Sequence, residues 1–245
     1  MAFETLGSAS FPSGRAVVID TGLLSGAGKD QWATWGVVAE GVPRGTFTVK
    51  AERVGEGDWA ECWRAVWVEI ADGTIAHSKQ LGTAIVDFAR LMFIDADAIK
   101  TWRDDVSLDG NADFVFWGRD AEALARAVDA PPLGDGTFGW CDRAVDEIVA
   151  LGTRAEETRT ARGWRLMTDF RPHTHHFLVL ADARASATGS GELELEGSRT
   201  CMFFTSWGDG AFPVLADRDS NGNLLRLRVQ LQTEDSVAAM HAVSS

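Results

Sequence analysis

The chain of 245 residues carries 23 basic and 36 acidic side chains, which gives a formal net charge of −13 at pH 7. Hydrophobic residues make up 45% and charged residues 24%, so a sizeable core can form and we expect disorder only at the ends of the chain. The sequence contains no basic run that could neutralise phosphates, which argues against nucleic acid and anionic membranes as partners. A basic protein would instead be attracted to this acidic surface.

The three cysteines, Cys62, Cys141 and Cys201, lie far apart in the chain and form no Cys-x-x-Cys pair. An odd number of scattered cysteines is typical of reduced thiols inside a cell rather than of a disulfide framework. The first residues include no positively charged region with an apolar stretch behind it, and no apolar run of about 18 residues follows. The sequence therefore predicts a cytoplasmic protein with neither a signal peptide nor a membrane-spanning helix.

In the N-terminal half, two segments have the pattern of β-strands. Ala16–Ile19 is a continuous apolar run, which predicts a strand buried on both faces. Thr46–Glu52 alternates polar and apolar side chains and predicts a strand with one buried face. Val86–Asp95 fits either a strand or a helix, and Asp97–Trp102 fits a short helix after it.

Helical patterns are concentrated in the middle of the chain. Asp120 is a candidate cap for a helix over residues 121–128, and apolar residues at helical spacing predict a second helix over 142–162. Between them, Ala130–Gly136 contains two prolines and two glycines, which stop helices and central strands. This stretch is the candidate division between two lobes of a single domain over residues 1–245.

Three further strands are predicted in the C-terminal third. Phe177–Leu180 is another continuous apolar run, and Glu192–Glu196 alternates acidic with apolar side chains. Leu225–Gln232 alternates leucine and valine with arginine and glutamine, which is the clearest strand pattern in the chain. Together the elements predict an α+β fold, mainly antiparallel β-sheet and sandwich-like, with two or three helices in the middle of the chain.

Residues Asp217–Asn223 match the first half of a calcium-binding EF-hand loop, with oxygen-bearing side chains at positions one, three and five and a glycine at position six. Position twelve is Arg228, where the loop needs a glutamate, and the flanking segments have strand patterns. A turn at Asn221 and Gly222 between two strands explains the same residues without a metal, so we predict a β-hairpin.

Three of the five histidines lie between Pro172 and Phe177. In a strand, His173 and His175 would point to one face, close enough to share a zinc or iron ion, while His176 would point away. No third ligand follows at a recognised spacing. We expect no cofactor, and we keep His173 and His175 as the candidate ligands of a divalent metal.

Catalytic motifs of other classes are absent from the sequence, which has no Gly-x-Ser-x-Gly elbow, phosphate-binding loop or dinucleotide glycine pattern. Ten tryptophans and no tyrosine make the aromatic composition unusual. Trp59, Trp63 and Trp67 recur every four residues and would share one face, either as a platform for a sugar or a partner or as core. Apolar residues on the opposite face favour a strand buried on both sides, so we predict core.

Three segments, taken in order, carry a family likeness: Pro12–Asp20, then Gly82–Asp87 leading to Phe93–Asp95, and Ser206–Val214 followed by the Asn-Gly turn. They resemble the bacterial family known as domain of unknown function 4241, and the C-terminal segment is the most specific. The resemblance implies a β-rich cytoplasmic domain, and small acidic bacterial proteins of this kind include immunity proteins and antitoxins. It implies no reaction and hence no catalytic residues.

Within the C-terminal segment, Asp209 lies in a Gly-Asp-Gly sequence that suits a sharp turn between strands. The alternative is an acidic ligand site that combines Asp209 with Asp87, Asp95 and the neighbouring Trp207.

Three functions are compatible with these patterns. The first is a non-enzymatic protein-binding domain of the immunity type, whose acidic surface covers a basic toxin. The second is a metal-dependent hydrolase that uses a His/Asp site, and the third is a carbohydrate-binding domain that uses exposed tryptophans.

Overall fold

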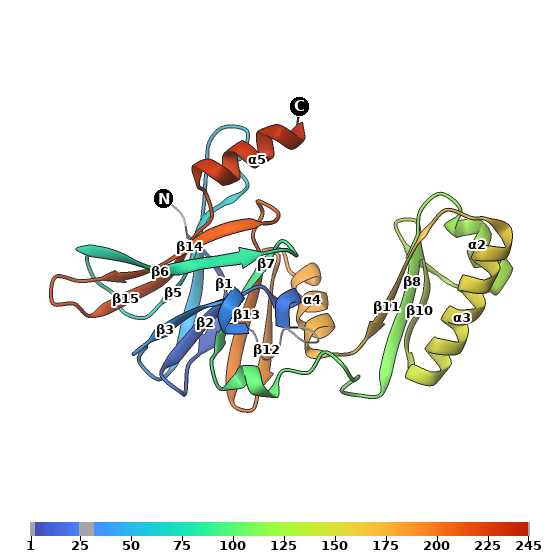
Figure 1. The fold of residues 1–245 in the computed structure, drawn as a ribbon, viewed down its shortest axis with the longest axis horizontal. Helices are drawn as coiled ribbons and strands as arrows, with labels where there is room; N and C mark the ends of the chain where they lie inside the picture. The colour runs from blue at the N-terminus through green and yellow to red at the C-terminus, as the bar shows by residue number, and fades with distance from the viewer. Residues whose placement is uncertain (1–2, 25–31, 245) are drawn as a thin grey trace. The chain divides into compact units, whose positions relative to one another are not determined.

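The computed structural model describes residues 3–24 and 32–244, and these divide into two compact units. Figure 1 labels the helices and strands. Unit 1 comprises the described residues up to Trp102 and those from Val179 onward, and unit 2 is inserted between them as Arg103–Leu178. The stretch 130–136, expected to divide two lobes, lies inside unit 2. Its prolines and glycines form the short strand β9 (Pro132–Gly134) and the turn after it rather than a linker between units.

Unit 1 contains two antiparallel sheets packed face to face as a sandwich. One sheet has six strands, in the order β1 (Phe3–Ser10), β4 (Thr46–Arg53), β5 (Trp63–Glu69), β15 (Leu224–Gln230), β14 (Gly210–Arg218), β6 (His77–Val86). The other has five strands, in the order β12 (Ser190–Leu195), β13 (Ser198–Phe204), β7 (Arg90–Asp95), β2 (Arg15–Ile19), β3 (Val37–Glu40). The mainly antiparallel, sandwich-like α+β fold predicted from the sequence is confirmed.

Strands β2 and β7 are buried on both faces, which explains their continuous apolar sequences. In β7, Leu91 and Phe93 face the core between the two sheets, while Met92 and Ile94 face a second cluster on the other side. That second cluster also contains Trp102, which follows the 3-10 helix η3 (Ala98–Thr101), and residues of helix α4 (His175–Ala185). The ambiguous segment at residues 86–95 is therefore the last residue of β6, a turn and the whole of β7.

Side-chain hydrogen bonds join one edge of the sandwich. Ser190 Oγ donates to the Leu6 carbonyl at 2.7 Å, and Ser198 Oγ donates to the Ser10 carbonyl at 2.9 Å. Both bonds run from the five-stranded sheet to β1, so they satisfy buried polar groups where the two sheets meet.

The prediction of a strand at Phe177–Leu180 is wrong, because this segment lies in helix α4. A short apolar run fits a buried helix as well as a buried strand, and the alanine-rich residues that follow favour the helix. The expectation that His173 and His175 lie in one strand and point to the same face is therefore wrong as well. Strand β11 (Met167–Pro172) ends just before His173, and His175 is the first residue of α4.

The hairpin predicted at Asp217–Asn223 is confirmed, since β14 pairs antiparallel with β15. The Asp219 carboxylate accepts the backbone N–H groups of Asn221 and Asn223, both at 2.8 Å, and Gly222 has the positive φ of +85° that the turn requires. These contacts account for the residues that resemble a calcium loop.

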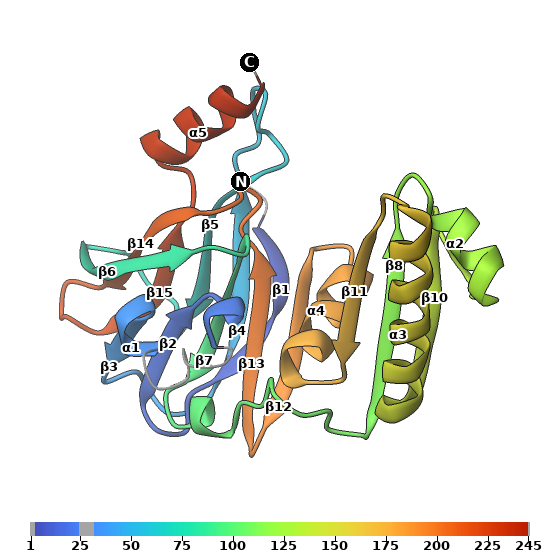
Figure 2. The ribbon, with the colours of Figure 1, turned by 45° about the vertical axis from the view of Figure 1, so that its right-hand side comes forward.

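Unit 2 contains a four-stranded antiparallel sheet. Helices α2 (Ala121–Val128) and α3 (Val145–Arg162) lie on one face of this sheet, as Figure 2 shows. The elements of unit 2 follow in the order β8 (Asn111–Trp117), α2, β9, β10 (Thr137–Ala144), α3, β11. The strand order β11-β8-β10-β9 makes this the β-α-β-β-α-β, ferredoxin-like topology. The two predicted helices are confirmed, although α3 begins at Val145 rather than Asp142 because β10 continues through Ala144.

The remaining helices are short or lie at the C-terminus: η1 (Thr21–Leu24), α1 (Trp32–Trp35) and α5 (Glu234–Ser244). Helix α5 was not predicted, and it packs Val237 and Met240 against the core of unit 1. Across residues 3–24 and 32–244, no helix is both long and apolar enough to cross a membrane.

Candidate functional site

Asp209 lies at a turn of unit 1. Its Oδ1 accepts the backbone N–H of Ala89 at 2.8 Å, directly before β7. Ala89 has φ +53°, in the left-handed region that a residue with a Cβ rarely adopts, so the carboxylate holds a strained backbone position. The turn interpretation of the Gly-Asp-Gly sequence accounts for this contact.

Asp95 does not lie beside Asp209, whereas Asp87 is only two residues from Ala89, which Asp209 contacts. Asp87 is exposed, and its backbone N–H donates to Asp20 Oδ2 at 2.9 Å. Asp95 is buried at the far end of β7, about 20 Å along the strand, where its Oδ2 accepts the Ser13 N–H at 2.9 Å. The structure therefore does not bring Asp95 together with Asp209 in the way that the alternative expects.

Trp207 is part of the core. Only 2% of its surface is exposed, and its Nε1 donates to the Trp63 carbonyl at 2.7 Å. Trp63 and Trp67 are also buried, so the prediction that these two indoles belong to the core is confirmed. None of these three rings is available as a platform for a ligand.

Asp20 is a fully buried carboxylate that the sequence did not single out. Its oxygens accept the backbone N–H groups of Gly22, Asp87 and Phe88 at 2.8–2.9 Å, and Arg90 lies 4.0 Å away. Burial raises the pKa of Asp20, although these hydrogen bonds and Arg90 act in the opposite direction. Because backbone donors occupy both oxygens, Asp20 ties η1 to the turn between β6 and β7 and has a structural role.

His173, in contrast, lies among three carboxylates of unit 2. Its Nδ1 is 2.8 Å from Asp109 Oδ2, and its Nε2 is 3.2 Å from Asp113 Oδ1 and 3.8 Å from Asp142 Oδ1. The imidazole is 12% exposed, and the side chain of Asp142 is 84% exposed, so the cluster is anchored inside the unit and open on one side.

His175 does not belong to this cluster. Its Nδ1 accepts the backbone N–H of Arg103 at 2.8 Å, which fixes the start of α4 to the segment that enters unit 2. Of the two histidines predicted as metal ligands, only His173 belongs to a group of three potential ligands among the residues that the structure describes.

A β-bulge brings the carboxylates together. Trp140 of β10 pairs with Phe114 of β8, and Arg143 pairs with Ala112, so two residues of β10 face one residue of β8 between them. The two residues are Cys141 and Asp142, and the one residue is Asp113. Asp142 has φ +55°, and its backbone N–H donates to Asp113 Oδ1 at 2.9 Å. The bulge therefore turns the Asp142 side chain towards Asp113 and the end of β11.

Asp109 and His173 perturb each other. The hydrogen bond from His173 is the main reason that the pKa of Asp109 falls to about 2. For His173, burial acts to lower the pKa, but hydrogen bonds to Asp109 and Asp113 outweigh it and raise the pKa. With Asp109 accepting from Nδ1–H, the Nε2 atom is directed at Asp113 and Asp142.

This geometry fits a metal ion. One ligand atom from each of Asp113, Asp142 and His173 lies within 4.8 Å of the other two. Bonds of 2.0–2.1 Å in a tetrahedral zinc site place neighbouring ligand atoms about 3.3 Å apart, and the two distances from Nε2, 3.2 and 3.8 Å, are close to this value. Asp109 then occupies the position of the carboxylate that orients a metal-bound histidine through its other nitrogen.

Sequence reasoning identified His173 but missed its partners Asp109, Asp113 and Asp142. One local signal was present, because Asp113 interrupts the apolar residues of β8 with a charge. The long-range pairing of β8 with β10 and β11 brings the cluster together, and local patterns do not reveal it.

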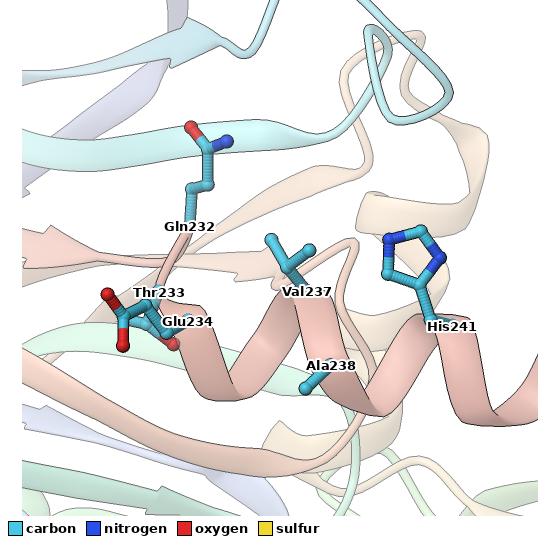
Figure 3. Close-up of a pocket in the computed structure, with 6 residues that line it drawn as sticks. All are labelled: Gln232, Thr233, Glu234, Val237, Ala238 and His241. Carbon is cyan, nitrogen blue, oxygen red and sulfur yellow. The ribbon is translucent and has the colours of Figure 1, made fainter.

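A surface depression with a volume of about 540 Å³ runs beside α5 (Figure 3). Its lining comes from a single stretch of chain: Gln232, Thr233, Glu234, Val237, Ala238 and His241. Because no second element contributes a polar group, this depression lacks the converging contacts of a ligand site.

No family model, curated protein or solved structure matches this chain. The resemblance to the domain of unknown function 4241 therefore stays a prediction.

Proposed function

We propose that unit 2 binds a divalent metal ion through Asp113, Asp142 and His173, with Asp109 orienting the imidazole. The single observation that carries this proposal is the position of His173 Nε2, 3.2 Å from one carboxylate oxygen and 3.8 Å from another. Imidazole nitrogens and carboxylate oxygens are common ligands of zinc, and these two distances are close to the separation of neighbouring ligand atoms in a zinc site.

The charge balance of the cluster also supports the proposal. Asp109, Asp113 and Asp142 lie around one imidazole, so even a protonated His173 leaves an excess of negative charge that a divalent cation would neutralise. Binding displaces the proton from Nε2 and leaves Nδ1–H donating to Asp109.

Metal titration of the purified chain, after treatment with a chelator, tests the proposal. We expect one equivalent of Zn²⁺ to bind per chain, and we expect His173→Gln and Asp142→Asn each to weaken binding at least about tenfold. Asparagine tolerates the positive φ at residue 142, so Asp142→Asn removes the charge without disturbing the bulge. Asp135→Asn is the matched control, since Asp135 also has a positive φ and lies in the β9–β10 turn of the same unit.

Two outcomes would contradict the metal site. One is the absence of stoichiometric uptake by the wild-type chain. The other is equal affinity in wild type, His173→Gln and Asp142→Asn, which would mean that the ion binds elsewhere. The alternative is that His173 is protonated and only forms structural ion pairs with Asp109 and Asp113. In that case we expect the first outcome, no metal uptake.

Recognition of a basic protein is a second candidate function, and an exposed apolar pair favours it. Trp117 of β8 and Met167 of β11 are direct cross-strand partners on the face of the sheet away from α2 and α3, and they are 37% and 62% exposed. An exposed apolar pair on a chain of net charge −13 suits a basic partner that combines apolar contact with charge attraction.

A pull-down from native extract at low and high salt tests this second function. We expect a partner of high isoelectric point that is released by salt and is not retained by a Met167→Glu variant. Val149→Glu is the control, because Val149 is exposed on α3, outside the pair. Retention of the same partner by Met167→Glu would refute this assignment of the surface.

A further inference from the structure

We propose that strand β11 of unit 2 pairs, along its free edge, with the same strand of a second copy of this chain, and that the two sheets join across a two-fold axis. β11 is an edge strand of its sheet, and in the part of the chain that the structure describes it pairs only with β8. The outer edge of such a strand presents N–H and C=O groups that a further strand can bind. The proposal does not depend on a metal ion.

The pairing with β8 determines which backbone groups of β11 point outward. The His173 N–H donates to the Asn111 carbonyl at 3.2 Å, so His173 and every second residue before it form the hydrogen-bonded pairs with β8. The backbone groups of Thr168, Phe170 and Pro172 therefore point to the free edge. Phe170 is the middle one of the three. With a two-fold axis beside it, each Phe170 N–H donates to the Phe170 carbonyl of the second copy in an antiparallel ladder.

The charged side chains of β11 select this register and identify a second copy as the partner. With Phe170 opposite Phe170, Asp169 of each copy lies opposite Arg171 of the other. Moving the centre of pairing by one residue would place Asp169 opposite Asp169 or Arg171 opposite Arg171, and like charges directly opposite destabilise a sheet. The two side chains are 35% and 23% exposed, so both can reach a partner across the edge. Strand β11 is thus complementary in charge to itself.

Phe170 adds an apolar contact on the other face of the sheet. It is the cross-strand partner of Phe114, a core residue of unit 2, yet 40% of its own surface is exposed. Phe170 and Pro172 line a depression of about 420 Å³ together with Val106 and Val145. The Phe170 ring of the second copy would pack against its counterpart beside this depression, and the contact would cover apolar surface that the single chain leaves exposed.

The assembly stops at two copies. Pro172 has no N–H, and its carbonyl already accepts the Thr174 N–H at 2.6 Å, so the new ladder ends there. The opposite edge of the sheet is β9, which is three residues long and begins with Pro132, so it offers no comparable strand. Pairing of one edge with itself uses that edge up and gives a closed dimer rather than a filament.

Light scattering after size-exclusion chromatography, over a concentration series of the full chain up to the high micromolar range, tests the proposal. We expect the mass to rise to twice the chain mass of 26.5 kDa. Asp169→Lys and Arg171→Glu each place like charges opposite one another on both sides of the axis, so each variant alone should be monomeric. An equal mixture of the two should form a mixed dimer, because every charge then faces its opposite. Phe170→Thr keeps a strand-forming residue and should weaken the wild-type dimer about tenfold.

Glu122→Lys and Arg126→Glu are the matched controls. They make the same charge changes in an exposed ion pair of α2, and both should remain dimeric. A wild-type chain that stays monomeric over the whole series would refute the proposal. A dimer that persists unchanged in Asp169→Lys, Arg171→Glu and Phe170→Thr would overturn it as well, because another surface would then join the copies. A mixture of folded Asp169→Lys and Arg171→Glu chains that stays monomeric would overturn the register.

Discussion

Replacement of Asp217 by alanine should destabilise unit 1 strongly, since its carboxylate is completely buried between strands β14 and β15. Its Oδ2 accepts from Arg228 Nε at 2.7 Å, and its Oδ1 accepts from the Arg228 guanidinium at 2.9 Å and from Ser78 Oγ at 2.6 Å. Loss of one partner from a buried ion pair costs about 3–5 kcal/mol. Because the Arg228 side chain keeps 21% of its surface exposed, water can solvate it partly, and we expect about 3 kcal/mol.

Chemical denaturation followed by tryptophan fluorescence measures this loss, since Trp63, Trp67 and Trp207 are buried in unit 1. Asp72→Asn, which changes an exposed carboxylate of the same unit, should remain within about 0.5 kcal/mol of wild type. The reasoning would be refuted if Asp217→Ala lost less than about 1 kcal/mol of unfolding free energy.

The same carboxylate predicts a dependence on pH. Burial acts to raise the pKa of Asp217, but its hydrogen bonds with Arg228 and Ser78 outweigh this effect and lower the pKa. A lowered pKa in the folded state means that the contribution is complete above the unfolded value of about 3.9 and disappears as the pH falls through the folded value. The difference between wild type and Asp217→Ala should thus be constant near pH 7 and shrink in acid, and a difference that grows on acidification would contradict the assignment.

Three further substitutions test other contacts. Trp207→Phe removes the donor to the Trp63 carbonyl and leaves a smaller ring in the core, so we expect a loss of about 2–4 kcal/mol in denaturant unfolding. Asp109→Asn should weaken Zn²⁺ binding about 10–100-fold in a calorimetric titration without changing the stoichiometry, because Asp109 orients a ligand rather than binding the ion. Gly22→Ala places a Cβ 2.2 Å from the Phe88 ring, so it should cost about 1–3 kcal/mol in thermal unfolding, and Phe88→Ala should relieve most of that cost.

Local patterns predicted the strands with the clearest periodicity, because strands with one or two buried faces leave a direct mark on the order of apolar residues. The alternation in Leu225–Gln232 and the continuous run in Ala16–Ile19 correspond to β15 and β2, and the Asn-Gly turn corresponds to the hairpin before β15. The same reasoning failed at Phe177–Leu180, where four apolar residues satisfied both a strand and the helix that forms.

The division into units was beyond local reasoning for a different physical reason. Residues 103–178 form a compact unit of their own because β11 returns to pair with β8, and that pairing joins residues 50 to 60 positions apart. The prolines and glycines at 130–136 correctly predicted a break in regular structure. The same residue types occur in a hairpin turn within a unit and in a linker between units, so they could not tell the two apart.

The sequence by itself determined the acidic, β-rich character of the chain and singled out His173, because composition, periodicity and residue type are local properties. Only the tertiary structure decided which side chains meet. It separated His175 from His173, placed Trp207 in the core, and brought Asp113 and Asp142 to His173 through a bulge. A ligand cluster depends on strand register and on one extra residue in β10, and neither has a signature in the order of residues along the chain.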